Sequence, residues 1–262
     1  MGSATRSATE AARAALAATS GVDVTTGEQL LAAARVIGSS KQLVSALTDS
    51  SADAAAKGGL IGAIFSTVQP QVRSLLEGMV AGRWSSGDDL LSGIEEVGIC
   101  AIATSVGSDD SLEGELFVFG QAVSSDAELE LAIGSKRAAP KGKLALVQAL
   151  LSSASPQARA IVGHLVQQPR GRRIGELVSF AAATVADASG RGVATVTVAR
   201  PLTAEQRTAI EESVTRRYGR AHTLNQVIDP AIIGGVRVQV GDEVVDGSIA
   251  ARLTELKLRL AG

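Results

Sequence analysis

The sequence predicts a mostly α-helical protein that ends in a small α+β domain. Apolar residues recur at helical spacing from Ser7 to about Ala188, and the period changes to two after Gly190. Much of the helical part also matches itself when it is shifted by 86 residues. We therefore expect an N-terminal helical bundle with a tandem helical repeat and a smaller mixed domain, with domains at residues 1–106, 107–190 and 191–262.

Short Gly, Ser and Pro breaks divide the helical part into elements of ordinary length. Pro70 and Pro156 each suit the first turn of a helix, where a backbone N–H has no helical partner to lose. The helices are expected at about residues 5–19, 27–38, 40–48, 52–66, 69–82, 87–106, 112–123, 126–134, 141–153, 156–168 and 173–188.

The 86-residue repeat needs no gap over its best stretch. Residues 57–66 align with residues 143–152, and the pattern Pro-Gln-x-Arg that begins at Pro70 recurs at Pro156. Chance matching in a chain rich in Ala, Leu and Ser is the alternative, but a single offset for all the matches favours duplication. We expect the helix ending near Val106 to close the first unit and to open the second.

The C-terminal part alternates strands and helices. Residues 193–199 read as a strand, and Thr203 and Gln206 form a capping box that starts a helix to about Tyr218. Residues 221–228, 236–240 and 243–245 read as further strands, with a two-residue hairpin turn before the last of them. A leucine-rich helix, capped by Ser248, is expected to follow.

Composition excludes several classes of function. The net charge of −2 comes from 25 basic and 27 acidic residues mixed along the chain, which argues against a nucleic-acid partner. One cysteine, Cys100, excludes an internal disulfide, and His164 and His222 are expected to be structural. No run approaches the roughly 20 apolar residues that cross a bilayer, so we expect membrane association only through a partner.

The sequence also lacks the patterns of a catalytic site. It has no phosphate-binding loop, no nucleophile elbow and no zinc signature, so we predict no catalytic residue, no cofactor and no metal. The pair Glu95-Glu96 is expected to face water on a helix surface, and Asp88-Asp89 to lie at a helix start. The cluster Arg170-Gly171-Arg172-Arg173 is expected to be a solvated loop without a function of its own.

The last third of the chain carries one specific pattern. It runs from an Asp-Pro through a double glycine and a Gly-Asp turn to an Asp-x-Ser and a closing helix, and it resembles the C-terminal signature of the ATP synthase delta subunit family. The mitochondrial counterpart in that family is the oligomycin-sensitivity-conferring protein. Each motif residue also has a structural explanation in a bend, a turn or a cap. The motif residues are Asp229, Pro230, Gly234, Gly235, Gly241, Asp242, Asp246 and Ser248.

The resemblance implies a non-enzymatic stator subunit of a bacterial F-type ATP synthase. Such a subunit links the N-terminal helix of the alpha subunit to the C-terminal end of the b subunit, on the cytoplasmic face of the membrane. The chain is longer than usual for the family and looks like the actinobacterial form. For the alpha-binding groove we select Val72, Leu75, Leu76 and Met79, whose alternative role is to fill the bundle core, and for the stalk Leu253, Leu256 and Leu260.

Two other classes of function remain open at this point. The helical part alone would also suit a helical-repeat scaffold or adaptor unrelated to the synthase. A small-molecule enzyme that uses the C-terminal sheet is the third possibility, and a deep pocket lined by titratable groups in that domain would support it.

Overall fold

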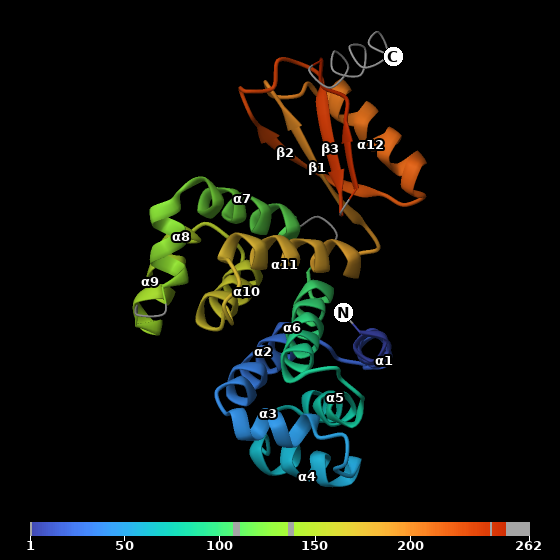
Figure 1. Cartoon of the computed structure of the whole chain (residues 1–262), viewed down its shortest axis with the longest axis vertical. Helices are drawn as coiled ribbons and strands as arrows, with labels where there is room; N and C mark the ends of the chain where they lie inside the picture. The colour runs from blue at the N-terminus through green and yellow to red at the C-terminus, as the bar shows by residue number, and fades with distance from the viewer. Residues whose placement is uncertain (1, 107–110, 136–138, 242, 250–262) are drawn as a thin grey trace, which may run out of the picture. The chain divides into compact units, whose positions relative to one another are not determined.

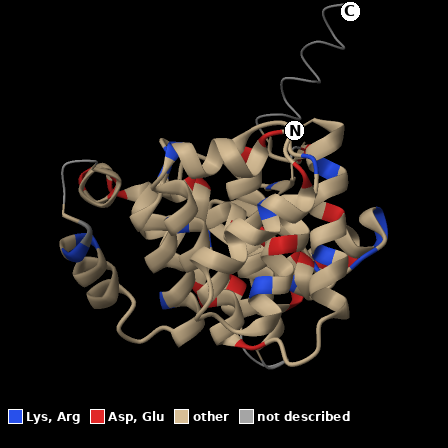
Figure 2. Ribbon diagram, turned by 90° about the horizontal axis from the view of Figure 1, so that it is seen from below, with Lys and Arg blue, Asp and Glu red and all other residues tan. Residues whose placement is uncertain are grey.

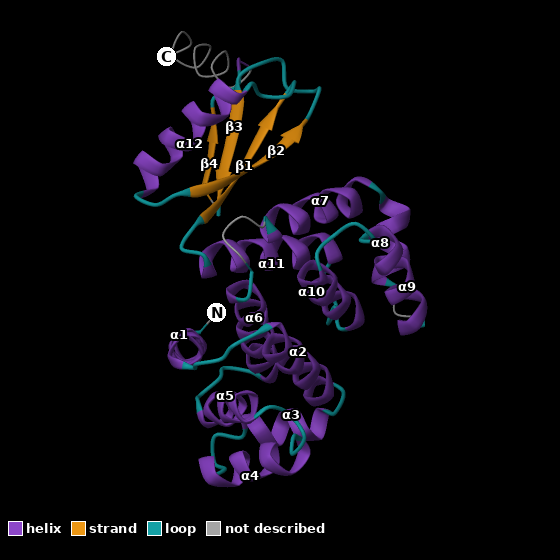
Figure 3. Ribbon diagram, turned by 180° about the vertical axis from the view of Figure 1, so that it is seen from behind, coloured by secondary structure: helices purple, strands orange, loops and turns teal. Residues whose placement is uncertain are grey.

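A computed structural model describes residues 2–106, 111–135, 139–241 and 243–249 (Figure 1). Within these residues helices fill the chain as far as Ala188, and the strands come after them with one further helix (Figure 3). The helices are α1 (Ser3–Ala18), α2 (Val24–Gly38), α3 (Lys41–Thr48), α4 (Ala54–Ile64), α5 (Pro70–Ala81), α6 (Gly87–Thr104), α7 (Leu112–Ser125), α8 (Ala127–Gly134), α9 (Pro140–Leu150), α10 (Pro156–Gln167), α11 (Ile174–Ala188) and α12 (Ala204–Tyr218). The strands are β1 (Gly192–Val198), β2 (His222–Ile228), β3 (Val236–Val240) and β4 (Glu243–Asp246). The predicted fold class is confirmed.

The chain forms two compact units, Met1–Val185 and Ala186–Gly262. The boundary lies within α11, close to the change of period at Gly190. The division of the helical part at residue 106 stays a prediction.

The helix bounds repeat at the interval found in the sequence. Helices α3, α4 and α5 reappear as α8, α9 and α10 with both ends shifted by 86 residues. At the same offset the last residue of α1 falls on the last residue of α6, which begins two residues earlier than the shifted α1. The two halves of the helical unit therefore have the same order of elements, and α6 serves as the last helix of the first half and the first helix of the second.

Side-chain caps explain why several helices start where they do. Asp23 accepts a hydrogen bond from the backbone of Thr26 at 2.7 Å and closes a capping box at the start of α2. Ser40, Ser86 and Ser155 cap α3, α6 and α10 by accepting a hydrogen bond from a backbone N–H of the first turn, without a capping box. Asp88 and Asp89 follow in the first turn of α6, where carboxylates favour the positive end of the helix dipole, as predicted.

Two hydrophobic clusters hold the helical unit together, and α6 contributes to both. One includes Leu30, Ile61 and Leu76, and the other includes Leu116 and Ile161. Full burial of each such side chain stabilises the fold by about 1.5–3 kcal/mol. From Leu90 to Ala103 only one residue of α6, Ser92, is not buried, because neighbouring helices surround it.

The contact between α2 and α6 depends on two glycines. A Cβ atom on Gly27 would lie 2.6 Å from the backbone oxygen of Gly98, and one on Gly98 would lie 2.8 Å from Leu31. The two helix backbones therefore approach more closely than larger residues would permit. This crossing fixes α2 against the central helix.

The C-terminal unit is a four-stranded sheet in the order β2-β1-β3-β4 with α12 packed against it. Strands β1 and β2 are parallel, and β3 pairs antiparallel with both β1 and β4. Alternate residues of β1, among them Ala194 and Val196, point into the core with Val214 of α12. The predicted strands, capping box and hairpin are confirmed, while Asp242 and the predicted terminal helix beyond Ile249 lie outside the described residues.

Candidate functional site

The most unusual polar feature of the helical unit is a buried carboxylate on α6. The side chain of Glu95 is 1% exposed and accepts hydrogen bonds from His164 at 3.1 Å, Arg170 at 3.2 Å and Arg172 at 2.8 Å. Arg35 of α2 lies 2.9 Å from the other ring nitrogen of His164. We call these five residues the Glu95 cluster; it joins α2 and α6 of the first half to α10 and the following loop of the second half.

The charges in the Glu95 cluster fix its hydrogen-bonding roles. Burial alone would raise the pKa of Glu95, but the bonds from His164 and the two arginines outweigh burial and hold that pKa below its usual range. Burial lowers the pKa of His164, which keeps its ring neutral. Because Arg35 can only donate, the Nδ1 atom of His164 accepts from Arg35 and its Nε2–H donates to Glu95.

Two interpretations from the sequence are wrong at this site. Arg170 and Arg172 were expected to be solvated, but both bind the buried Glu95. Glu95 and Glu96 were expected to face water, but both are buried, and Glu96 accepts a hydrogen bond from Arg13 at 2.6 Å. Desolvating these charges requires close partners, and the partners lie too far along the chain for a local pattern to reveal them.

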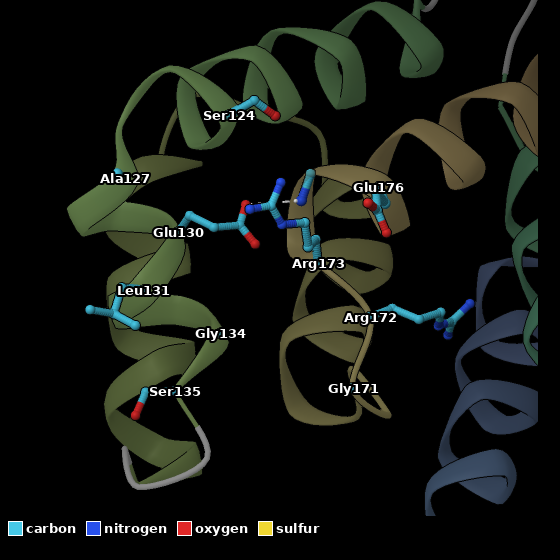
Figure 4. Close-up of a pocket in the computed structure, with 11 residues that line it drawn as sticks. Ser124, Ala127, Glu130, Leu131, Gly134, Ser135, Gly171, Arg172, Arg173 and Glu176 are labelled. Carbon is cyan, nitrogen blue, oxygen red and sulfur yellow. Dashed lines mark hydrogen bonds between the residues drawn. The ribbon is translucent and has the colours of Figure 1, made fainter.

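A pocket of about 510 Å³ opens between α8 and the start of α11 (Figure 4). Glu130 points from α8 towards the first turn of α11 and accepts from the backbone N–H groups of Ile174 at 2.7 Å and Gly175 at 3.2 Å. Arg172 points away from the pocket. The N-terminal end of a helix is where an anion would bind, and at α11 the Glu130 carboxylate already occupies it. The contact is better explained as a link between α8 and α11 than as part of a ligand site.

The C-terminal unit has a second pocket of about 300 Å³, between α12 and the sheet. Its lining is mainly apolar, including Ile210, Val236 and Val238, and its titratable side chains are Arg217 and Tyr218. It is therefore not the convergent titratable pocket that an enzyme would require.

The C-terminal motif residues hold two loops together. Gly234 and Gly235 have φ angles of +134° and +85°, and a Cβ on Gly235 would lie 2.5 Å from the backbone oxygen of Gly247. Asp246 accepts from the backbone N–H of Ser248 at 2.9 Å. At the start of the loop between β2 and β3, Asp229 accepts from the N–H of Ala231 at 2.9 Å, in the turn that contains Pro230. Gly241 takes the positive φ of the hairpin turn.

The four side chains selected for the alpha-binding groove lie in the core of the first half. Val72 and Leu76 are fully buried, and Leu75 and Met79 are 4% and 3% exposed. Their contact with a partner stays a prediction. Leu253, Leu256 and Leu260 lie outside the described residues.

Over the described ranges, no group of three or more His, Cys, Asp or Glu side chains could hold a metal ion. Among those same residues, no helix combines the length and apolar character that a membrane span requires. Basic and acidic residues are interspersed along the ribbon (Figure 2). The two histidines are accounted for structurally, since His222 is buried and bonded to the backbone of Arg220.

Comparison with known proteins gives a consistent result. The model of a family described as ATP synthase delta (OSCP) subunit matches residues 98–260. The chain is 46% identical to ATP synthase subunit delta of Leifsonia xyli over 265 residues, with 100% of both chains covered. It is 35% identical to that of Streptomyces griseus over 271 residues, again with both chains fully covered, and 35% identical to that of an Arthrobacter species over 238 residues and 86% of each chain. A chain of the Toxoplasma gondii mitochondrial ATP synthase hexamer matches with 20% identity and a TM-score of 0.38, covering 64% of this chain and 96% of that one, a likeness too low to carry an argument.

Proposed function

Because the chain belongs to the ATP synthase delta (OSCP) subunit family, we propose that it is the stator subunit that ties the catalytic head of an F-type ATP synthase to the peripheral stalk. The observation that carries this function is the full-length match to actinobacterial delta subunits. The subunit performs no catalysis and acts by binding, at the cytoplasmic face of the membrane, which it reaches only through the complex. The unrelated scaffold is not favoured.

The helical unit is the part that would hold the head, by binding the N-terminal helix of the alpha subunit. Packed helix pairs present the ridges against which an amphipathic helix can lie with anchors at i, i+3, i+4 and i+7. The polar groups of the unit serve structure, since the Glu95 cluster and Glu130 are satisfied internally. This supports a rigid binding platform rather than a reactive site.

The C-terminal unit would hold the end of the b subunit, close to the motif. Ile233 is 80% exposed, and Ile249 is 47% exposed next to it, near Gly234. Val244 and Val245 of β4 are also exposed. Exposed apolar side chains such as Ile233 and Ile249 near the motif indicate a protein-binding surface, and Leu253 and Leu256, selected for the stalk, follow Ile249 in the sequence.

Membrane vesicles that carry the whole synthase provide the test. Removing this subunit should abolish ATP-driven proton pumping while the head still hydrolyses ATP, because an untethered head turns with the shaft. Adding back the chain should restore pumping, Ile233→Glu should restore it poorly, and Leu131→Glu, also on an exposed side chain, should restore it fully. Proton pumping that persists at the full rate without the chain would contradict the stator function.

A further inference from the structure

A groove of about 430 Å³ lies where α2 meets α10, and Leu144 of α9 also lines it. Three small residues belong to its lining, Ala32 on α2 and Ala160 and Gly163 on α10, and their lack of bulk leaves room between the helices. The volume falls within the range of roughly 300–1,000 Å³ that small-molecule sites have. We call this feature the α2–α10 groove.

The charged residues of the α2–α10 groove are mainly basic. Arg35 and Arg159 line it, against one carboxylate, that of the exposed Glu28. Two arginines against one glutamate leave one positive charge in excess. Arg159 is fixed in place, because its Nη1 atom donates to the backbone oxygen of Ala154 at 2.9 Å. The groove is therefore suited to an anion.

Arg35 is the cation whose charge the fold leaves without a counterpart. Its side chain has five N–H donors, and one of them bonds the Nδ1 atom of His164 at 2.9 Å. Its Nε and Nη2 atoms have no partner among the described residues and are not buried, so they are accessible from the groove. Burial lowers the pKa of Arg35, and no described carboxylate offsets this effect.

The neighbouring arginines are in a different situation. Arg170 and Arg172 both donate to the buried carboxylate of Glu95, at 3.2 and 2.8 Å. Arg35 reaches Glu95 only through the ring of His164, which is neutral. A partly buried cation is costly unless an anion pairs with it, and the Glu95 cluster supplies none for Arg35.

We propose that the α2–α10 groove binds a small oxyanion, a carboxylate or a phosphate group, held by the Nε and Nη2 atoms of Arg35. The planar guanidinium presents two parallel N–H groups that match two oxygens of either anion. The rest of the ligand lies against Leu144, Ala32 and Ala160. This site goes beyond the stator function: α2 belongs to the first half and α10 to the second, so a bound anion stabilises the junction of the two halves.

Inorganic phosphate and acetate are the probes, each added to the full chain in a separate NMR titration. Sodium chloride at the same ionic strength is the reference. The amide signals of residues 28–35 and 159–167 should shift and saturate, with a Kd of about 1–10 mM for the better anion. Tighter binding of phosphate would identify a phosphate group as the ligand, and tighter binding of acetate a carboxylate.

Two variants test the role of Arg35. Arg35→Gln removes the guanidinium and should raise the Kd at least about tenfold. Because Arg35 also bonds His164, a second variant keeps that bond: Ala32→Glu places a carboxylate one turn before Arg35 on α2, where it pairs with the guanidinium from within the chain. This variant should raise the Kd by a similar factor. Circular dichroism checks that each variant is folded.

Arg83→Gln is the matched control. Arg83 is an exposed arginine outside the groove, and its variant should bind both anions as the unaltered chain does. Equal shifts with chloride, or a loss of binding in Arg83→Gln as large as in Arg35→Gln, would indicate an adventitious ion only and overturn the proposal. So would a Kd that Ala32→Glu leaves unchanged, or the absence of any shift up to about 20 mM of either anion.

Discussion

Replacing Glu95 by glutamine tests whether the buried carboxylate holds the helical unit together. The substitution preserves the size of the side chain but removes the charge that Arg170, Arg172 and His164 share. Breaking a buried ion pair by removing one partner destabilises a protein by about 3–5 kcal/mol. Arg172 is 32% exposed and can regain water, so we take the lower end, about 3 kcal/mol.

That loss should be visible in equilibrium unfolding. For a unit of this size about 3 kcal/mol corresponds to a fall in Tm of roughly 6–12 °C. Urea unfolding can be followed through Trp84, the only tryptophan, which packs against Gly93 of α6, two residues before Glu95. Glu10→Gln on the exposed side of α1 is the control and should change stability by less than about 0.5 kcal/mol. A Glu95→Gln variant as stable as this control would refute the reasoning.

Three further predictions concern a titrating group and two close approaches. Burial keeps the pKa of His164 in the folded protein below its value in the unfolded chain, so the unfolded chain binds more protons between these two pKa values. The free energy of unfolding should therefore fall as the pH drops below about 6.5. Urea unfolding of the His164→Gln variant should lack this part of the pH dependence. Gly98→Ala would place a Cβ 2.8 Å from Leu31 and should destabilise the helical unit by about 1–3 kcal/mol in urea, whereas Gly59→Ala, in open space, should stabilise it by up to about 1 kcal/mol. Gly235→Ala would put a side chain at a φ of +85° and a Cβ against the backbone of Gly247, and it should destabilise the C-terminal unit by about 2–4 kcal/mol. Hydrogen exchange of the sheet amides measures this loss. Unchanged protection would contradict the role of the motif in holding the two loops together.

Most of the helical architecture could be predicted from the sequence, because it depends on short-range signals. Apolar spacing locates a helix, and Pro70 and Pro156 mark two helix starts within one residue. The repeat is equally accessible, since an insertion-free duplication preserves both the spacing and the breaks. The strands could be predicted from the alternation of apolar and polar residues. The hairpin turn at Gly241 could be predicted from the two residues that separate the strands β3 and β4.

The Glu95 cluster could not be predicted in the same way. Its members come from residues 35, 95, 164, 170 and 172, and no periodicity relates them. One signal was available. Glu95 and Glu96 stand between Ile94 and Val97 in a stretch that is otherwise apolar all round the helix, and a carboxylate in such a helix must find a cation. Attending to that conflict would have predicted burial, though not which arginines supply the charge.

The double use of α6 has a consequence for how such a chain can grow. A bundle that closes on itself has no free end, but here each 86-residue period adds five helices and borrows its first from the period before. The arrangement is therefore an open array, in which a further copy could be inserted in frame without creating a new boundary or exposing a core. It also means that no linker separates the two halves, because the last helix of the first half is also the first helix of the second.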